Sequence, residues 1–330
     1  MASVSELIEK WLLDDYPYIA VNKRRITEQI NIIYRDKSYA GIPASRIRNS
    51  SPKNEQIAST IQDLIYRGVM EPENKYNFDD DEKKFLSLET NIRGTFFSNR
   101  IPEHFLISKK NIDSREQIIC SIFPYGYISH ISAMRWYGIT DRLPKEVYYT
   151  ALSKEQWKKR SLIEITTRMG NNIKANEFIP TYPRNEIYFG RRLIVTSKEI
   201  NSLPLENSLG VRVQNVGELF NSMFSKTDYC GGQQHVIDVF KEHGDSVKNT
   251  VIKYVDRFGS KIDKARIGFM YSRVLDVESE IIEKWKIESQ KTRGSSKKLF
   301  SNAPFCSAYC EEWNLSLNTH IEGFSDAFDS

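Results

Sequence analysis

Cysteine is scarce in this chain of 330 residues, with four cysteines at positions 120, 230, 306 and 310. Such scattered positions do not make the disulfide framework of a small secreted protein, so we expect a reducing cytoplasm as its location. Cys306 and Cys310, even with His320, lack the second pair of ligands that a zinc site normally has. Cys230 and His235 resemble a thiol with its base, but a buried structural cysteine is the more common case. Spacing alone therefore points to no metal site.

Long apolar runs and a large net charge are also absent. The mean hydropathy is −0.50, and no run of about eighteen apolar residues occurs, which argues against a transmembrane helix. The first six residues lack the basic and then apolar regions of a secretory signal. A net charge of +4 says little about partners by itself. With 40% hydrophobic residues, the chain can still build real cores, and its length suits two domains.

The common catalytic motifs are weak or missing. The pair Gly231-Gly232 precedes a helix-like segment, but no Lys-Ser or Lys-Thr follows, so the phosphate-binding loop pattern is absent. The Glu-x-Lys pattern at Glu82-Lys83-Lys84 lies in an acidic stretch without an apolar strand leading into it. That context is poor support for a metal-dependent nuclease. We therefore expect no enzyme activity and no cofactor.

Positive charge is concentrated near the start of the chain. Between positions 22 and 67, nine basic residues stand against four acidic ones, so this stretch carries +5 and the rest of the chain −1. Basic residues gathered on one surface are a common footprint of nucleic-acid binding. A second basic stretch, at 284–298, contains Arg-Gly-Ser-Ser and is more typical of a solvated loop.

Apolar periodicity predicts a helical N-terminal domain. The helical segments that we expect are 6–14, 23–37, a short turn at 44–49, and 53–66. Ser51 followed by Pro52 is a strong start for the last of them, because serine suits the N-cap and proline the first helical position. Gly68 suits its end.

A polar hairpin should follow these helices. It would lie near 71–84, with strands near 85–88 and 95–98, and its four acidic residues at 79–82 would repel phosphate. Helices followed by a hairpin are the order of a winged helix-turn-helix, which we expect to span residues 1–104. Winged helices also serve as protein-interaction modules, so this order leaves the partner open.

The segment 53–66 has the two faces that a recognition helix needs. Its expected buried residues are Ile57, Ile61, Leu64 and Ile65. Its expected outward residues are Gln56, Ser59, Gln62, Asp63 and Tyr66. The full set that we expect to contact DNA is Lys23, Arg24, Arg25, Arg46, Arg48, Lys53, Asn54, Gln56, Ser59, Thr60 and Arg67. Three of these, at 23–25, would hold a phosphate at the start of the preceding helix.

Residues 105–330 alternate between strand-like and helix-like patterns, with strands first and helices later. The expected strands are 147–149, 162–166, 186–189, 192–195 and 210–213. The expected helices are 129–137, 216–223, 233–243, 246–259, 261–274 and 278–287. Strands followed by helices predict the α+β class, here a mixed α/β domain after the winged helix.

Four segments of this second domain resemble a known family. The first is Tyr127-Ile128-Ser129-His130-Ile131-Ser132-Ala133-Met134, continuing to Tyr137-Gly138-Ile139-Thr140-Asp141 and Pro144. The others are Cys230-Gly231-Gly232-Gln233 with Val236 and Val239, Arg266-Ile267-Gly268-Phe269-Met270, and Lys298-Leu299-Phe300 with Trp313-Asn314-Leu315 and Asn318. In this order they resemble the AbiEi family, the antitoxins of type IV toxin–antitoxin systems used in phage abortive infection.

The resemblance implies a winged-helix DNA-binding domain ahead of an antitoxin domain at 105–330. Gly94-Thr95-Phe96-Phe97 resembles the strand that closes the family's winged helix, whereas residues 216–221 depart from its usual Arg-Thr pair and Asp. The implied function is a cytoplasmic antitoxin and transcriptional autorepressor. It would bind inverted repeats in double-stranded DNA upstream of its own operon and counteract a nucleotidyltransferase toxin, without a cofactor and without a membrane partner.

Most of the resembling residues are expected to hold the fold. Ser129 would cap the helix at 129–137, and Gly138 would end it. Two other functions stay open at this point. One is a nuclease-like defence effector, for which Asp141 and Glu164 are the carboxylates to test. The other is an adaptor protein whose winged helix binds no nucleic acid.

Overall fold

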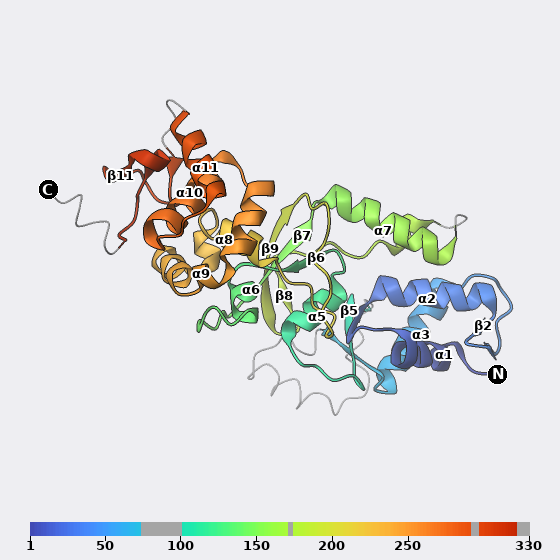
Figure 1. Cartoon of the computed structure of the whole chain (residues 1–330). Coiled ribbons are helices and arrows are strands. Elements are labelled where there is room, and N and C mark those ends of the chain that lie inside the picture. Colours follow the sequence, from blue (N-terminus) through green and yellow to red (C-terminus); the bar gives the residue numbers. More distant parts are fainter. Residues whose placement is uncertain (74–100, 171–173, 292–296, 322–330) are drawn as a thin grey trace. The chain divides into compact units, whose positions relative to one another are not determined.

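The computed structural model describes residues 1–73, 101–170, 174–291 and 297–321 (Figure 1). The chain forms two compact units. Unit 1 comprises Met1–Tyr127 and Lys145–Arg212, and unit 2 comprises Ile128–Pro144 and Val213–Ser330. Both combine helices with small sheets, so the predicted α+β class is confirmed. The boundary that we expected after residue 104 falls within a strand of unit 1, His104–Ile107.

The first part of unit 1 alternates helices and short strands. Its elements are α1 (Val4–Lys10), which continues as a π-helical turn (Trp11–Asp15), β1 (Ala20–Asn22), α2 (Lys23–Asp36), α3 (Asn54–Tyr66), β4 (Met70–Pro72) and β5 (His104–Ile107). The strands form an antiparallel sheet in the order β1-β5-β4. Its register aligns Val21 with Phe105 and Met70 with Ile107.

The core of this part follows from the apolar spacing of its helices. Ile26, Ile30 and Ile33 of α2 are fully buried, as are Ile61 and Leu64 of α3. They pack in one cluster with residues of α1, β4 and β5. Burial of each such side chain contributes about 1.5–3 kcal/mol, which is why the helical periodicity predicts these elements well.

The segment between α2 and α3 differs from the prediction. Residues 44–49 form no helix; instead a small hairpin pairs β2 (Ser38–Tyr39) with β3 (Ile42–Pro43), and Arg46 follows with a left-handed φ of 61°. Helix α3 starts at Asn54 rather than after Ser51, because Lys53 takes the extended N-cap conformation. Of the predicted hairpin, 71–73 complete β4 and a turn. Its acidic tip, the strands at 85–88 and 95–98, and the segment Gly94-Thr95-Phe96-Phe97 lie outside the described residues.

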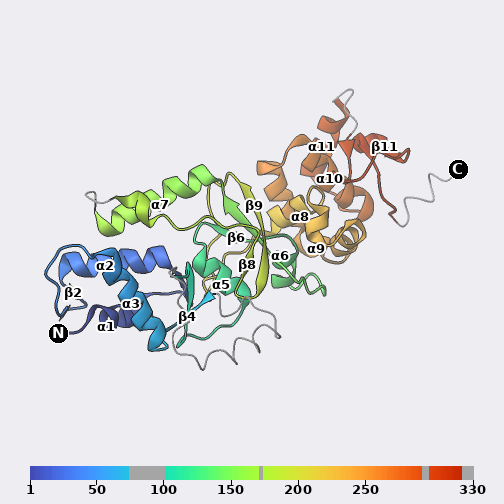
Figure 2. The ribbon, with the colours of Figure 1, turned by 180° about the vertical axis from the view of Figure 1, so that it is seen from behind.

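The second part of unit 1 is built on a sheet in the order β6-β7-β9-β8. Its elements are α5 (Arg115–Ile122), β6 (Gly126–Ile128), β7 (Val147–Leu152), α7 (Lys154–Met169), a 3-10 turn (Ala175–Phe178), β8 (Ile187–Tyr188) and β9 (Arg191–Lys198). Strands β7 and β9 are parallel, and parallel neighbours need a crossover connection, which α7 provides. Helix α7 lies beside α2, as Figures 1 and 2 both show, and Arg35 of α2 donates to the Met169 carbonyl.

The prediction of a strand at 162–166 is wrong, because these residues lie in α7. Trp157, Ser161, Ile165 and Met169 are buried at intervals of four residues, so a helical stripe, rather than an alternating strand, faces the core. The strand expected at 210–213 is also wrong. Residues there make only isolated bridges, Ile128 with Val213 and Glu206 with Arg212.

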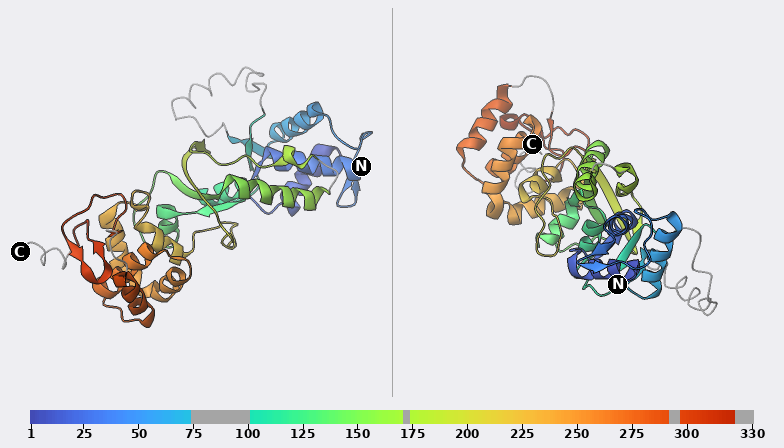
Figure 3. Two further views of the ribbon diagram at one scale, coloured as in Figure 1. Left: turned by 90° about the horizontal axis from the view of Figure 1, so that it is seen from above. Right: turned by 90° about the vertical axis from the view of Figure 1, so that its right-hand side faces the viewer.

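Unit 2 is mainly helical. Its helices are α6 (His130–Trp136), α8 (Val216–Met223), a 3-10 turn (Thr227–Cys230), α9 (Gln233–Phe258), α10 (Lys261–Phe269) with a π-helical turn (Met270–Val274), α11 (Glu280–Lys291) and a further 3-10 turn (Glu311–Trp313). A small three-stranded sheet contains β10 (Lys297–Lys298), β12 (Leu315–Ser316) and β11 (Tyr309–Cys310), in that order. Helices α9, α10 and α11 pack together in the orange part of the ribbon (Figure 3).

Two segments of unit 2 that we expected to be separate helices form a single helix. The segments 233–243 and 246–259 form the single helix α9, which passes through Gly244 without a break. A Cβ at Gly244 would lie 2.8 Å from Leu275, so the glycine serves close packing rather than a turn. Part of the basic stretch at 284–298, expected as a loop, belongs to α11. Among the described helices, none combines the length and apolar character needed to cross a membrane.

Candidate nucleic-acid interface

One face of α3 is polar and open to solvent. Glu55, Ser59, Gln62 and Tyr66 follow one another at intervals of three or four residues, which places them on the same side of the helix. All four are exposed, and Tyr66 retains 89% of its accessible surface. Their side chains make no hydrogen bond or ion pair with any described residue. This face is therefore available to a partner.

Thr60 lies on the other side of α3. It is buried next to Ile61, and its hydroxyl donates to the Gln56 carbonyl at 2.8 Å. A threonine that bonds back to its own helix in this way has no free donor for a base edge. Although we expected Thr60 to contact DNA, its position leaves it outside the exposed face.

The first turn of α3 combines capping with exposed polar groups. The Lys53 amide donates to the Gln56 side-chain oxygen at 2.9 Å, so Gln56 helps to cap the helix. The side chains of Lys53 and Asn54 are exposed and make no hydrogen bond with the described residues. Because unpaired backbone N–H groups also gather at a helix start, this end suits a negatively charged partner.

Exposed cations precede the exposed face along the chain. Arg46 and Arg48 are exposed in the segment before α3, and like Lys53 they form no ion pair within the described part of the chain. Arg46 lines a surface groove of about 990 Å³ between the start of α1, residues 45–47 and α3. The groove is also lined by Arg67 and by the acidic Glu6, Glu55 and Asp63, so acidic and basic side chains are mixed along it.

The basic cluster at the start of α2 is engaged inside unit 1. The Nζ of Lys23 lies 3.9 Å from Glu103, and the Nε of Arg24 lies 3.7 Å from the same carboxylate. Arg24 also donates to the Glu177 carbonyl at 2.6 Å. The Asn22 side chain caps the helix by accepting from the Arg25 amide at 2.8 Å. The structure thus places protein groups where we expected a phosphate.

Arg25 belongs to a buried ionic cluster. Its guanidinium lies 3.2 Å from Glu28 and 4.8 Å above the Trp11 ring, and burial lowers its pKa. Glu28 also accepts from Arg168 of α7, with an Nε–Oε1 distance of 2.5 Å and an Nη2–Oε2 distance of 3.1 Å. The cluster joins α2 to α7. Sequence reasoning had no signal for it, because 140 residues separate Glu28 from Arg168.

Arg67, at the end of α3, is also paired. It contacts Glu9 of α1 and lies 3.5 Å from Asp63. Lys109 approaches the same Glu9 at 3.2 Å. Arg67 therefore balances acidic neighbours. Of the expected DNA-contacting residues, Arg46, Arg48, Lys53, Asn54 and Ser59 are exposed, on α3 or in the segment before it, and Arg46 and Ser59 line the same groove.

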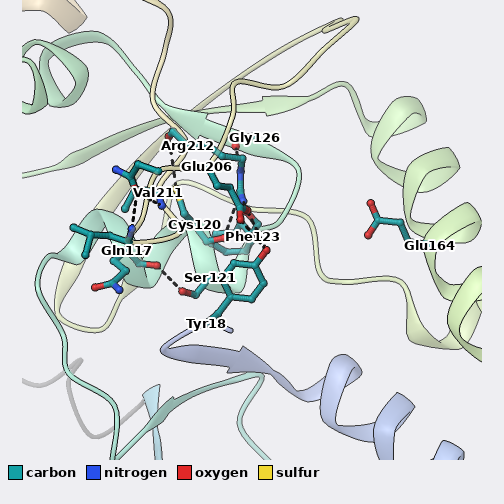
Figure 4. A network of polar contacts seen from close by, with 12 residues as sticks. Tyr18, Gln117, Cys120, Ser121, Phe123, Gly126, Glu164, Glu206, Val211 and Arg212 are labelled. Carbon is teal, nitrogen blue, oxygen red and sulfur yellow. Dashed lines mark hydrogen bonds and ion pairs between the residues drawn. The ribbon is translucent and has the colours of Figure 1, made fainter. Parts of the chain in front are cut away.

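A second polar network lies in the interior of unit 1 (Figure 4). The buried Arg212 donates to three carbonyls, those of Cys120 at 2.7 Å, Gly126 at 2.8 Å and Phe123 at 2.9 Å. Its remaining partner is Glu206, which accepts from the Tyr18 hydroxyl at 3.0 Å. Each guanidinium nitrogen of Arg212 and the Tyr18 hydroxyl has a partner within unit 1, so this arginine has a structural role.

The residues considered for catalysis lie in structural surroundings. Glu164 accepts from the Tyr125 hydroxyl at 2.9 Å and from Arg160 at 3.3 Å, and Asp141 is exposed. Burial raises the pKa of the Cys230 thiol, which is the opposite of what activates a thiolate nucleophile. Within the described residues, no three His, Cys, Asp or Glu side chains come together as metal ligands.

The segments that resemble the AbiEi family contact one another in unit 2. Arg266 donates to the Lys298 carbonyl at 2.9 Å, and a Cβ at Gly268 would lie 2.1 Å from the Trp313 ring. The Asn318 side chain accepts from the Phe300 amide and donates to its carbonyl, both at 2.9 Å. The first contact ties α10 to β10, the second packs α10 against the 3-10 turn Glu311–Trp313, and the third joins the residues that follow β10 and β12.

The other two AbiEi-like segments, at 127–144 and 230–239, also contact each other. Arg142 donates to the Gly231 carbonyl at 2.5 Å, and the Thr140 hydroxyl lies 2.9 Å from the His235 Nε2. Burial, together with the Arg142 charge, lowers the pKa of His235. Gly138 follows α6 with a left-handed φ of 68°, as expected.

The expected side-chain cap at Ser129 is wrong. Ser129 occupies the N-cap position of α6 but makes no capping bond, because its hydroxyl lies 2.8 Å from the His130 Nδ1 instead. The buried Gln214 takes part in holding this helix start, since its side-chain oxygen accepts from the His130 amide at 3.0 Å.

Comparisons with solved structures give a distant structural likeness. No protein-family model and no curated protein matches the chain. The crystal structure of the RV2827C protein from Mycobacterium tuberculosis is similar, with a TM-score of 0.48 and 10% sequence identity. That likeness covers 94% of this chain and 90% of the other.

Proposed function

We propose that the chain is a DNA-binding antitoxin that represses its own operon in a type IV toxin–antitoxin system of phage defence. The observation that carries the DNA-binding part is the exposed face of α3, whose polar side chains lack partners in the described residues. The order α1-β1-α2-α3-β4-β5, with the antiparallel sheet β1-β5-β4, supports a winged helix-turn-helix. In that arrangement α3 is the helix that enters the major groove.

Repression in this proposal works by occupancy of the operator. Arg46, Arg48 and Lys53 neutralise phosphates, and the exposed face of α3 contacts base edges. Three phosphate contacts predict that log K falls with log salt at a slope of about −2.7 per bound chain. Arg25 is left out of this interface because it is half-buried and paired with Glu28, and Thr60 because it is buried. Lys23, Arg24 and Arg67 are left out because acidic neighbours already pair with them.

The antitoxin part of the proposal rests on the AbiEi-like segments. Their residues contact one another in unit 2, through Arg266, Gly268 and Asn318, so they support a shared fold of that unit rather than a catalytic site. The toxin would be a nucleotidyltransferase encoded beside this gene. Co-expression with that toxin tests this part: the full chain should restore growth, and a chain that never restores growth would contradict it.

A gel shift with the upstream DNA of the operon tests the DNA-binding part. The double variant Arg48→Ala/Lys53→Ala should lose affinity, since each phosphate contact contributes to binding. Lys284→Ala/Lys291→Ala is the matched control, because these exposed lysines of α11 make no ion pair within the described residues. Equal affinity of both double variants, or no binding at low salt, would favour the adaptor function instead.

A further inference from the structure

Residues of α2, α5, α7 and the 3-10 turn Ala175–Phe178 line a small cavity within unit 1. Its volume is about 150 Å³. Four charged side chains belong to its wall, namely Arg25, Glu28, Glu164 and Arg168. The rest of the wall includes two prolines and the rings of Tyr16, Tyr125 and Phe178. A cavity of about this volume holds one six-membered ring such as benzene.

Three of the four charged side chains already have hydrogen-bond partners. Glu28 accepts from the Nε of Arg168 at 2.5 Å and from its Nη2 at 3.1 Å. Glu164 accepts from the Tyr125 hydroxyl at 2.9 Å and from Arg160 at 3.3 Å. Neither carboxylate therefore needs a donor from a ligand, and Arg168 is held by Glu28.

The guanidinium of Arg25 is the group without a hydrogen bond. Its Nη1 lies 3.2 Å from the Glu28 carboxylate, yet this buried nitrogen donates no hydrogen bond within the described part of the chain. The Trp11 ring, 4.8 Å away, covers the guanidinium and leaves its N–H edge free. The side chain keeps 21% of its accessible surface. Because buried charges are normally hydrogen-bonded, Arg25 calls for an acceptor that the described residues do not supply.

The charges around the cavity define that acceptor. Arg25, Arg160 and Arg168 carry three positive charges against the two negative charges of Glu28 and Glu164, so one positive charge is left. The edge of a guanidinium donates two parallel bonds to a carboxylate, and the rings of the wall suit an apolar body. We propose that this cavity binds a small monocarboxylate with an apolar body of about one ring, and that Arg25 holds its carboxylate.

Titration of the full chain with benzoate tests this site, because benzoate is a carboxylate on a single ring. One benzoate should bind per chain by calorimetry, and it should raise Tm, since it binds the folded state alone. Benzamide has the same shape without the charge, so it should bind at least about ten-fold more weakly. Benzamide binding as tightly as benzoate, or no binding of benzoate at millimolar concentration, overturns the proposal.

A pair of arginine variants locates the site. Arg25→Gln should weaken benzoate binding by at least about ten-fold. Arg184→Gln is the matched control, because Arg184 belongs to unit 1, is 72% exposed and lies outside the cavity wall. Thermal unfolding without benzoate shows whether each variant folds. If Arg25→Gln does not fold, Arg25→Lys replaces it; it keeps the charge, loses the two-bond edge and should still bind benzoate more weakly. Benzoate affinity equal to that of the control in the folded Arg25 variant overturns the proposal.

Discussion

Replacing Glu28 by glutamine removes the negative charge that two arginines share. Glu28 is buried, with its side chain 1% exposed, and it contacts Arg25 at 3.2 Å and Arg168 at 2.5 Å. Removing one partner of a buried ion pair costs about 3–5 kcal/mol. Because Arg168 is 33% exposed and water screens it, we expect about 2–3 kcal/mol for Glu28→Gln. At about 2–4 °C per kcal/mol for a unit of this size, Tm should fall by roughly 4–12 °C.

Chemical and thermal unfolding of the full chain measure this loss. Glu186→Gln is the control, because the Arg184–Glu186 pair is exposed and its nitrogen–oxygen distance is 3.8 Å. Such a pair contributes less than about 1 kcal/mol. The double variant Glu28→Gln/Arg168→Met should recover part of the lost stability, because it removes one uncompensated cation. If Glu28→Gln unfolds like Glu186→Gln, the cluster does not hold α2 against α7 and the reasoning is refuted.

Three further results are expected. Gly268→Ala should destabilise unit 2 by about 1–3 kcal/mol, because the added methyl group would overlap the Trp313 ring; unchanged urea unfolding would contradict that packing. Burial and the nearby Glu206 raise the pKa of Tyr18 to about 12 from an ordinary 10.0, so the protonated phenol is favoured in the folded state and stability should decline as pH rises from 10 to 12. Tyr18→Phe should flatten that decline in urea titrations, and a slope identical to the wild type would count against it. Operator binding should weaken with salt at a slope of about −2.7, whereas a slope near zero would exclude phosphate neutralisation by Arg46, Arg48 and Lys53.

The helices were predictable wherever one stripe of side chains faces the core. The isoleucines of α2 recur at helical spacing, and the sequence predicts that helix to within one residue. We predicted a strand at 162–166 because β-branched and apolar residues dominate that segment. The buried residues Trp157 and Met169, outside that segment, complete the helical stripe that identifies α7. Near Gly244 we predicted a break between two helices, whereas α9 is continuous there. The sequence does not show that this glycine makes room for Leu275.

The candidate site was predictable only in its exposed part. Spacing places Ser59 and Gln62 on the outer face of α3, and burial agrees. The role of Arg25 was not predictable, because its partner Glu28 is fixed by Arg168 of α7, far along the chain. A count of basic residues gives the charge of a segment, but the pairing of each cation depends on tertiary contacts. The same holds for Lys23 and Arg24, whose shared partner is Glu103.

Site-specific photocross-linking tests most directly the claim that the exposed face of α3 meets a DNA groove. A photoreactive amino acid at Ser59 of the full chain, bound to the duplex from upstream of its operon, should give a light-dependent covalent protein–DNA adduct. The same amino acid at the exposed Gln290 of α11 should give none. Absence of an adduct at Ser59 under conditions where the chain binds the duplex, or equal adducts at both positions, would contradict the account.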